Sequence, residues 1–259
     1  ALAEAWKETD GERIFLSLYE TTDLRRLERV RTDFVANVSH ELRTPLTTIR
    51  AMAETLQDEP ENRELLDRYL AKIIAEVDRL SLIANDLLIL SAAESNPVRK
   101  QGCNVAEVFR SVAQQLRSKA EAKGLSIDVQ GPDRLLIEAN ASQLSQVAIN
   151  LIDNAINYTA EGGVNVIIQP EGDHVVIIVR DTGFGIASEH LPRIFERFYR
   201  VDKGRSRSTG GTGLGLSIVK HIVESHGGQV NVQSALNEGT SFFIRLPVGH
   251  ANAVETSDA

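Results

Sequence analysis

The sequence has 259 residues, of which 42% are hydrophobic and 25% are charged, and its formal net charge is −8. This length suits about two globular domains, the composition is ordinary for a folded protein, and the acidic balance argues against a nucleic-acid-binding function. The single cysteine, Cys103, excludes an internal disulfide framework, and no apolar run reaches the ~18–20 residues of a transmembrane helix, so we expect a cytoplasmic location for this part of the chain.

The first part of the sequence predicts one short strand followed by two long helices. Apolar residues within residues 12–19 are typical of a strand, and the residues Thr21–Asp23 are typical of a helix N-terminus. Over residues 24–56, apolar residues recur at steps of three and four, which predicts an amphipathic helix with coiled-coil character at its start. Residues 57–62 include a proline and supply a turn, and apolar residues over 66–90 predict the second helix.

Two long helices with a short connection form an antiparallel hairpin. Each helix carries an apolar stripe that the other helix alone hardly covers. We therefore expect two copies of the chain to form a four-helix bundle. The alternative is a monomeric hairpin that is covered by the rest of the chain.

The second part of the sequence mixes strand and helix patterns without regular βαβ repeats. The stretch from Ser95 to Gly102 contains Asn96-Pro97 and resembles a linker, which we place at residues 97–103. This pattern predicts an α+β fold in which a mostly antiparallel sheet carries helices on one face. Helices are predicted at residues 104–123, 142–158 and 216–225, and strands at 125–129, 135–138, 164–169, 174–180, 229–233 and 241–246.

One predicted helix of the second domain carries two asparagines. Asn150 and Asn154 are four residues apart, so both project from one face of the helix. An amide oxygen is a suitable ligand for Mg²⁺, which commonly takes few protein ligands and completes its shell with phosphate oxygens and water. Taken alone, such a pair is more often an ordinary feature of a helix surface.

An acidic residue follows a hydrophobic strand in the stretch Asp181-Thr-Gly-Phe-Gly-Ile186. A carboxylate at a strand end can accept a hydrogen bond from the exocyclic amine of adenine. Gly183 and Gly185 allow the backbone to approach a planar base closely. As a bare turn motif, this spacing of aspartate and glycine is common.

A glycine-rich loop runs into the last predicted helix. Gly211, Gly213 and Gly215 expose backbone amides beside a helix N-terminus, which is a favourable site for phosphates. No Lys-Ser/Thr pair follows, so it is not a Walker loop. It does not lie in a βαβ unit, which argues against a dinucleotide site.

The first long helix contains the stretch His40-Glu-Leu-Arg-Thr-Pro45. His40 lies off the apolar stripe, because Val38 and Leu42 flank it, so the imidazole should be exposed. A neutral imidazole is a nucleophile. Glu41 can accept a hydrogen bond from one ring nitrogen and thereby fix the tautomer. Thr44 shares the same face one turn later. An exposed histidine on a helix is, by itself, usually an ordinary surface residue.

The ordered set of motifs is far more specific than any one of them. Asn154, Asp181-x-Gly183-x-Gly185, residues 195–200 and Gly211-x-Gly213-x-Gly215 resemble the N, G1, F and G2 boxes of the histidine-kinase branch of the GHKL ATPases. The stretch around His40 resembles the H box of kinases with HisKA-type dimerisation domains. Together the resemblance covers nearly all of residues 24–248.

The resemblance implies a Bergerat-type site for ATP and Mg²⁺. Asn154 would hold Mg²⁺, Asp181 would read adenine, and Arg200 would lie near the terminal phosphate. Asn157 stands where a lysine often assists the phosphates, and Asn140 stands where aspartate usually precedes the helix. The nucleotide-binding residues implied are Asn150, Asn154, Asn157, Tyr158, Asp181, Gly183, Gly185, Ile186, Tyr199, Arg200, Gly211, Thr212, Gly213, Leu214, Gly215 and Leu216.

The function implied is that of a homodimeric sensor histidine kinase. His40 would be the phospho-acceptor, Glu41 the acid or base, and Thr44 would position water for dephosphorylation of the partner, while Arg200 assists transfer. The phosphoryl group would pass from Mg-ATP to His40 and then to an aspartate in the receiver domain of a response regulator. The coiled-coil start of the first helix would carry a signal as a rotation or shift. Membrane contact would arise only through an N-terminal region outside this sequence.

The domain boundaries follow from the same resemblance. Residues 10–23 resemble the end of a PAS sensor domain, and the whole resembles phosphate-regulon-type sensor kinases. Two alternatives remain: a mechanical ATPase of the GHKL superfamily, which would have no His-Glu-Leu-Arg-Thr-Pro hairpin, and a non-catalytic scaffold, in which the nucleotide motifs would have decayed. The expected parts are the end of a PAS-like domain at 1–22, a dimerisation and histidine phosphotransfer domain at 23–96, a linker at 97–103, an ATP-binding catalytic domain at 104–248 and a tail at 249–259.

Overall fold

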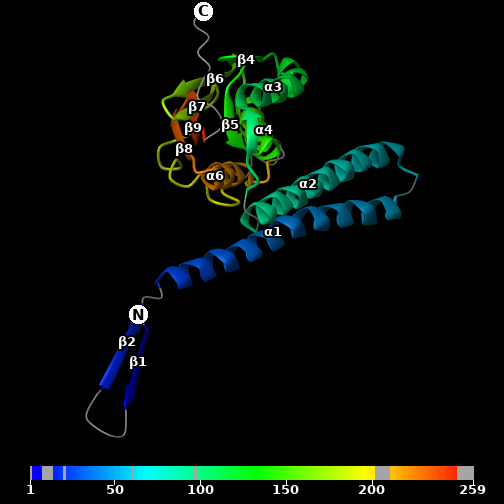
Figure 1. Cartoon of the computed structure of the whole chain (residues 1–259). Helices are drawn as coiled ribbons and strands as arrows, with labels where there is room; N and C mark the ends of the chain where they lie inside the picture. Colours follow the sequence, from blue (N-terminus) through cyan, green and yellow to red (C-terminus); the bar gives the residue numbers. More distant parts are fainter. Residues whose placement is uncertain are drawn as a thin grey trace, which may run out of the picture. The chain divides into compact units, whose positions relative to one another are not determined.

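The computed structural model of the chain describes residues 2–7, 14–19, 22–59, 61–95, 98–201 and 211–249. The chain divides into two compact units, Ala1–Leu80 and Ser81–Ala259, and Figure 1 follows the elements from one end of the chain to the other. The division falls inside the second long helix, so the last turns of that helix belong to the second unit.

The first unit contains a strand pair and a helical hairpin. β1 (Leu2–Lys7) pairs with β2 (Ile14–Tyr19) in antiparallel orientation, so the predicted strand has a partner that the sequence did not reveal. α1 (Thr22–Asp58) and α2 (Arg63–Ser95) are the two predicted helices. α2 begins where the Asn62 side chain accepts a hydrogen bond of 3.0 Å from the Leu65 amide.

α1 continues through Pro45, which is buried, although a proline removes one backbone donor from the helix. In the described part of the chain, none of the helices has both the length and the apolar character that a membrane crossing demands.

The second unit is built on a five-stranded sheet in the order β4-β6-β7-β9-β8. Only β4 and β6 run parallel, so the prediction of a mostly antiparallel sheet is confirmed. The strands are β4 (Ser126–Gln130), β6 (Gly163–Glu171), β7 (His174–Asp181), β8 (Gln229–Ala235) and β9 (Gly239–Pro247).

Part of the expected linker belongs to a separate pair of strands. β3 (Gln101–Asn104) pairs with β5 (Leu136–Ala139) in antiparallel orientation. Residues 101–103 were expected to belong to the linker at 97–103, and that expectation was wrong for them. A four-residue strand that contains a glycine has little strand propensity of its own, and its hydrogen bonds come from a partner more than thirty residues away.

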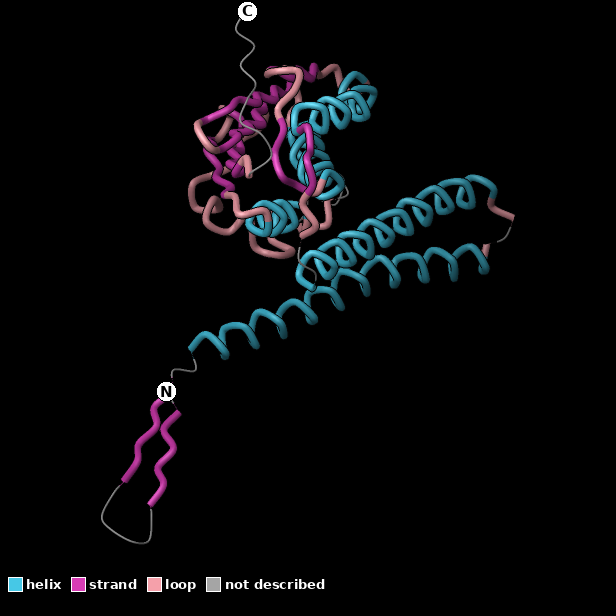
Figure 2. Tube along the Cα trace, viewed as in Figure 1, coloured by secondary structure: helices cyan, strands magenta, loops and turns pink. Residues whose placement is uncertain are grey.

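In the described residues, the sheet is covered by α3 (Val105–Glu121), α4 (Ala141–Tyr158) and α6 (Gly215–Ser225). Figure 2 shows the helices on one side of the strands, as predicted. Alternate residues are buried from Val164 to Ile168 in β6 and from Val175 to Val179 in β7, and these residues form the core together with the apolar face of α4.

His226 joins the ends of two helices in this core. It is the C-terminal cap of α6 and is 2% exposed. Its Nδ1 donates to the Ile222 carbonyl at 2.8 Å, and its Nε2 accepts from the Asn140 amide at 3.0 Å. Asn140 is in turn the N-cap of α4, where its side chain accepts from the Gln143 amide as expected of a capping asparagine. Only a neutral imidazole can make both bonds.

We predict that acid weakens the second unit through His226. Burial lowers the pKa of His226 from its ordinary value of 6.5. A lowered pKa means that the stabilisation is present above 6.5 and is lost as the pH falls below it, by at most ~1.4 kcal/mol per pH unit for one proton. The thermal midpoint of the wild type should therefore decrease when the pH is lowered from about 7 to about 5.5.

His226→Gln keeps an acceptor for the Asn140 amide but takes up no proton, so its midpoint should depend less on pH. The control is His174→Gln, which removes a histidine from the partly exposed start of β7. A pH dependence in His226→Gln as steep as in the wild type would contradict the prediction.

Candidate functional site

Asp181 lies at the end of β7 with its carboxylate largely buried, since the residue is 7% exposed. Its Oδ1 accepts hydrogen bonds from the Gly183 amide at 2.9 Å and from the Thr240 amide at 3.1 Å. Burial raises the pKa of Asp181, and the two amide hydrogen bonds oppose that rise. Within the described part of the chain, Oδ2 is the oxygen that remains to accept a hydrogen bond from a ligand.

The glycines of the two nucleotide motifs allow close approaches that a side chain would block. A Cβ on Gly183 would lie 2.2 Å from the Tyr158 carbonyl oxygen, at the end of α4. A Cβ on Gly213 would lie 2.9 Å from the Cα of Phe198, and Phe198 itself has a left-handed backbone with φ 62°. The Phe198 amide donates to the Gly213 carbonyl at 2.8 Å. The F and G2 motifs are therefore in direct backbone contact, and the strained Phe198 marks their junction.

The middle of α4 meets the first residue of α6. The Asn150 Oδ1 lies 3.1 Å from the position that a Cβ on Gly215 would occupy. The Nδ2 of Asn150 is buried and has no hydrogen-bond partner among the residues that the structure describes. Asn154 lies one turn further along α4 and is half-buried, so the two predicted asparagines do share one face of the helix.

Asn157 stands where, in the family that the sequence resembles, a lysine often contacts the phosphates. Its Nδ2 donates to the Asp153 Oδ2 at 2.9 Å, and the other Asp153 oxygen pairs with Lys119 of α3. The amide of Asn157 is therefore engaged with its own helix. Tyr158, next in the chain, has a half-exposed side chain and a carbonyl that accepts from the Phe184 amide at 3.1 Å.

The F motif places Tyr199 and Arg200 beside the glycine loop. The Tyr199 hydroxyl lies 2.8 Å from the Nδ1 of His190, and the Arg193 guanidinium lies 4.4 Å from the centre of the tyrosine ring. The Nη2 of Arg200 is 4.0 Å from the place of a Cβ on Gly211. Arg200 is thus next to the loop, its position near the terminal phosphate stays a prediction, and the Tyr199 hydroxyl already has a partner.

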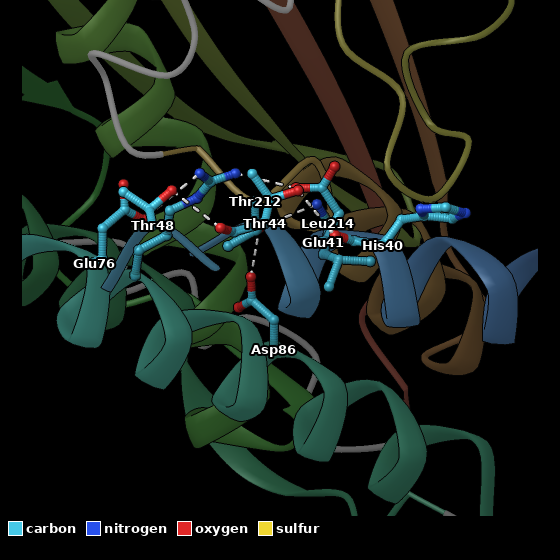
Figure 3. Close-up of polar contacts among 9 residues, drawn as sticks. His40, Glu41, Thr44, Thr48, Glu76, Asp86, Thr212 and Leu214 are labelled. Atoms are coloured by element: carbon cyan, nitrogen blue, oxygen red, sulfur yellow. Dashed lines mark hydrogen bonds and ion pairs between the residues drawn. The ribbon is translucent and has the colours of Figure 1, made fainter. Parts of the chain in front are cut away.

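Thr212 uses its hydroxyl within the second unit. The hydroxyl accepts from the Leu214 amide at 3.1 Å and donates to the Asp86 Oδ2 at 2.7 Å (Figure 3). Asp86 lies in the part of α2 that belongs to this unit, and burial raises the pKa of its carboxyl while the bond from Thr212 lowers it. The predicted phosphate contact of Thr212 would therefore compete with Asp86.

His40 is exposed on α1, as predicted. Thr44, also exposed, donates its hydroxyl to the His40 backbone carbonyl at 3.2 Å. Thr48 repeats this bond to the Thr44 carbonyl at 3.1 Å. The hydroxyl of Thr44 therefore lies one turn from His40, and its bond within the described residues is a local one to the backbone.

Glu41 does not make the predicted hydrogen bond to His40. Its Oε2 instead accepts from the Nη2 of Arg79 in α2 at 3.0 Å. Figure 3 shows the His40 ring directed away from the Glu41 carboxylate. The reason is geometric, because neighbouring residues of a helix point about 100° apart.

The residues present fit ATP and Mg²⁺. Buried polar atoms without partners are unusual in proteins, and the Asn150 Nδ2 is one that a nucleotide could satisfy. The glycine loop leads its amides to the N-terminus of α6, where anions are favoured. Asn154 offers an amide oxygen to Mg²⁺. Since the described residues contain no group of three or more His, Cys, Asp or Glu side chains that could hold a metal, such an ion would complete its shell with phosphate and water.

Thr240, Asp86 and Arg79 belong to these networks and were not predicted from the sequence. Thr240 follows the turn before β9 and acts through its backbone amide, for which no side-chain pattern gives a signal. Asp86 and Arg79 are charged residues between apolar positions of α2, and that interruption was the available signal.

Two family models match the chain. The His Kinase A (phospho-acceptor) domain matches residues 30–96, which include His40. The family described as Histidine kinase-, DNA gyrase B-, and HSP90-like ATPase matches residues 139–250, which include the asparagine, aspartate and glycine motifs.

Several proteins resemble the chain over most of its length. The sensor protein SrrB of Staphylococcus aureus strain N315 is 36% identical over 241 residues, which are 90% of this chain and 41% of SrrB. SrrB of strain NCTC 8325 matches with the same identity and coverage. The chain therefore spans less than half the length of these relatives.

Solved structures share the fold. Full-length ShkA in complex with AMPPNP is 30% identical, with a TM-score of 0.62 over 85% of this chain and 47% of ShkA. The Acinetobacter baumannii histidine kinase AdeS is 24% identical, with a TM-score of 0.64 over 82% of this chain and 98% of AdeS. The histidine kinase ThkA in complex with the response regulator protein TrrA is 23% identical, with a TM-score of 0.69 over 91% of this chain and 69% of ThkA.

We predict that Asp181→Asn separates nucleotide affinity from stability. An asparagine still accepts the two amides at Oδ1, but its Nδ2 would face the adenine amine, so the affinity for ATP should fall about tenfold or more. The raised pKa of Asp181 means that its charge weakens the folded state at neutral pH, so the thermal midpoint should not fall.

Calorimetry with ATP and a melting curve on the same preparation check both outcomes. Asp128→Asn is the control, because it removes an exposed carboxylate from β4 of the same sheet. Unchanged ATP affinity in Asp181→Asn would contradict the assignment of the adenine site.

Proposed function

The chain belongs to the sensor histidine kinases of two-component systems, and from this premise we propose that it transfers the γ-phosphoryl group of Mg-bound ATP to its own His40. The observation that carries the proposal is that one chain contains both an exposed imidazole, on α1, and a buried carboxylate with a glycine loop suited to a nucleotide.

The proposed nucleotide contacts use side-chain atoms and backbone amides of the described site residues. The Asp181 Oδ2 accepts the exocyclic amine of adenine. Asn154 supplies a ligand to Mg²⁺, which when bound neutralises phosphate charge, and Asn150 contributes its buried amide nitrogen. The glycine loop before α6 and the guanidinium of Arg200 face the phosphates.

The chemical step is an in-line displacement. One ring nitrogen of His40 forms a bond to the γ-phosphorus while the bond from that phosphorus to the β,γ-bridging oxygen breaks, so ADP leaves. The proton on the other ring nitrogen passes to the Glu41 carboxylate. The protein does little covalent work, since positioning and charge neutralisation supply most of the acceleration in such transfers.

The partners proposed are a second copy of the chain and a response regulator. Exposed apolar side chains on α2, among them Leu70, Ile74 and Val77, support a four-helix bundle between two copies. The phosphorylated imidazole is an energetic phosphoramidate, which suits transfer to an aspartate carboxylate of a receiver domain. The response regulator bound to ThkA supports this class of partner.

We predict that His40→Gln abolishes stable phosphorylation and leaves ATP affinity unchanged, because the acceptor and the nucleotide residues lie in different units. The variant and the wild type would be incubated with labelled ATP, and the label tested for lability in acid and stability in base. Undiminished label of that kind on His40→Gln would remove His40 from the mechanism.

We predict that Thr44→Ala spares autophosphorylation and slows dephosphorylation of the phosphorylated regulator by about tenfold or more. The expected loss corresponds to one hydrogen bond to an attacking water, ~1.4 kcal/mol. Autophosphorylation does not need this hydroxyl, because ATP supplies the phosphoryl group and Glu41 takes the proton.

Thr47→Ala is the matched control for Thr44→Ala. Thr47 is exposed on the same helix and makes the same kind of bond, to the Arg43 carbonyl at 2.9 Å. If Thr44 only satisfied the backbone, both variants would lower the melting temperature alike and neither would affect dephosphorylation selectively. Equal loss of both rates in Thr44→Ala would also exclude the water-positioning role.

A further inference from the structure

The carboxylate of Glu41 is held by the neighbouring helix. The Arg79 Nη2 lies 3.0 Å from the Glu41 Oε2, and the two side chains are only 13% and 33% exposed. All of these atoms belong to the first unit. Partial burial strengthens the attraction between the two charges but also removes solvation from each, so the net stabilisation by the pair stays modest.

A second acidic residue faces the same guanidinium. The Glu76 Oε2 lies 3.9 Å from the Nη1 of Arg79, one turn earlier on α2. That oxygen is buried and has no hydrogen bond among the described residues. Glu76 therefore offers Arg79 a second carboxylate, beside a different nitrogen from the one that donates to Glu41, at a distance too long for a direct hydrogen bond.

The position of Glu41 in this pair conflicts with its proposed work as the base. A base must lie within about 2.6–3.2 Å of the proton that it removes. The His40 ring points away from the Glu41 carboxylate in Figure 3, and the described residues show no hydrogen bond between the two side chains. A carboxylate directed at α2 cannot contact an imidazole on the exposed side of α1 at the same time.

We propose that Arg79 is a positioning residue that withdraws Glu41 from His40, so that autophosphorylation requires the Glu41–Arg79 pair to open. The inference rests on the proposed roles of His40 and Glu41. Glu76 acts in the opposite direction, because a guanidinium that turns to donate a direct hydrogen bond to Glu76 releases Glu41. The balance between the two carboxylates sets the fraction of molecules that are competent for phosphoryl transfer.

The first test measures the rate of autophosphorylation at saturating ATP in Arg79→Gln and Glu76→Gln. Arg79→Gln should raise the rate about two- to fivefold, the factor that corresponds to loss of a pair worth ~0.4–1 kcal/mol. Glu76→Gln should lower the rate, because Arg79 is then left to Glu41 alone. A loss of rate in a folded Arg79→Gln, or an unchanged or raised rate in Glu76→Gln, would overturn the proposal.

Arg50→Gln is the matched control, because it removes an arginine of the same unit that pairs with a glutamate, Glu54, at 2.7 Å on the exposed side of α1. Its rate should equal that of the wild type. Circular dichroism and melting curves of all variants separate changes in folding from changes in rate. If Arg79→Gln does not fold, Glu76→Gln alone decides the outcome, because it leaves the guanidinium in place.

The second test repeats Arg79→Gln in a Glu41→Gln background. If Arg79 acts through Glu41, the change at Arg79 has no effect once Glu41 has no carboxylate, whereas a structural role would change the rate equally in both backgrounds. An equal effect in both backgrounds would overturn the role of Arg79 and leave the proposed function intact. A Glu41→Gln rate equal to wild type would instead show that Glu41 is not the base, which overturns both assignments.

Discussion

Asp181 carries an ionisable group into surroundings where the residue is 7% exposed, and a charge in such a place is unfavourable unless hydrogen bonds stabilise it. The amides of Gly183 and Thr240 provide two such bonds to one oxygen. The two amides belong to the loop after β7 and to the start of β9, so the carboxylate holds these two backbone segments in position. Gly183 must lack a side chain because the Tyr158 carbonyl occupies that space. The carboxylate proposed to read adenine, the glycine turn and the end of α4 therefore form one packed arrangement.

The phosphate side of the site depends on the same kind of close approach. Gly215 starts α6 against the side chain of Asn150, and Gly213 lies against the backbone of Phe198. Phe198 keeps a left-handed conformation that a bulky residue rarely adopts, which is consistent with a junction that is determined by its neighbours. An arrangement held in this way presents its donors without rearrangement when a nucleotide arrives, and preorganised donors are the main source of acceleration in phosphoryl transfer.

The elements that the sequence predicted are those with a local signal. The apolar periodicity of α1, α2 and α4 and the alternation in β6 and β7 lie within each element, so each could be recognised without knowing its neighbours. β3 could not be recognised, because its stability comes from β5. The same limit applied to the site: His40 and Asp181 were found from motifs, whereas Arg79 matters only through a contact with another helix.

The bonds around His40 differ in how they respond to movement of a helix. Thr44 bonds to the carbonyl of His40 on the same helix, so this bond moves with α1 and is unaffected by a rotation of α1 against α2. The Glu41–Arg79 pair connects the two helices, and a rotation of α1 changes its length directly. Rotation about a helix axis is a common form of switching motion. A signal that arrives as a rotation would therefore change the position of the proposed base, while the nucleotide contacts of the second unit, which depend on backbone amides around Asp181, would stay as they are.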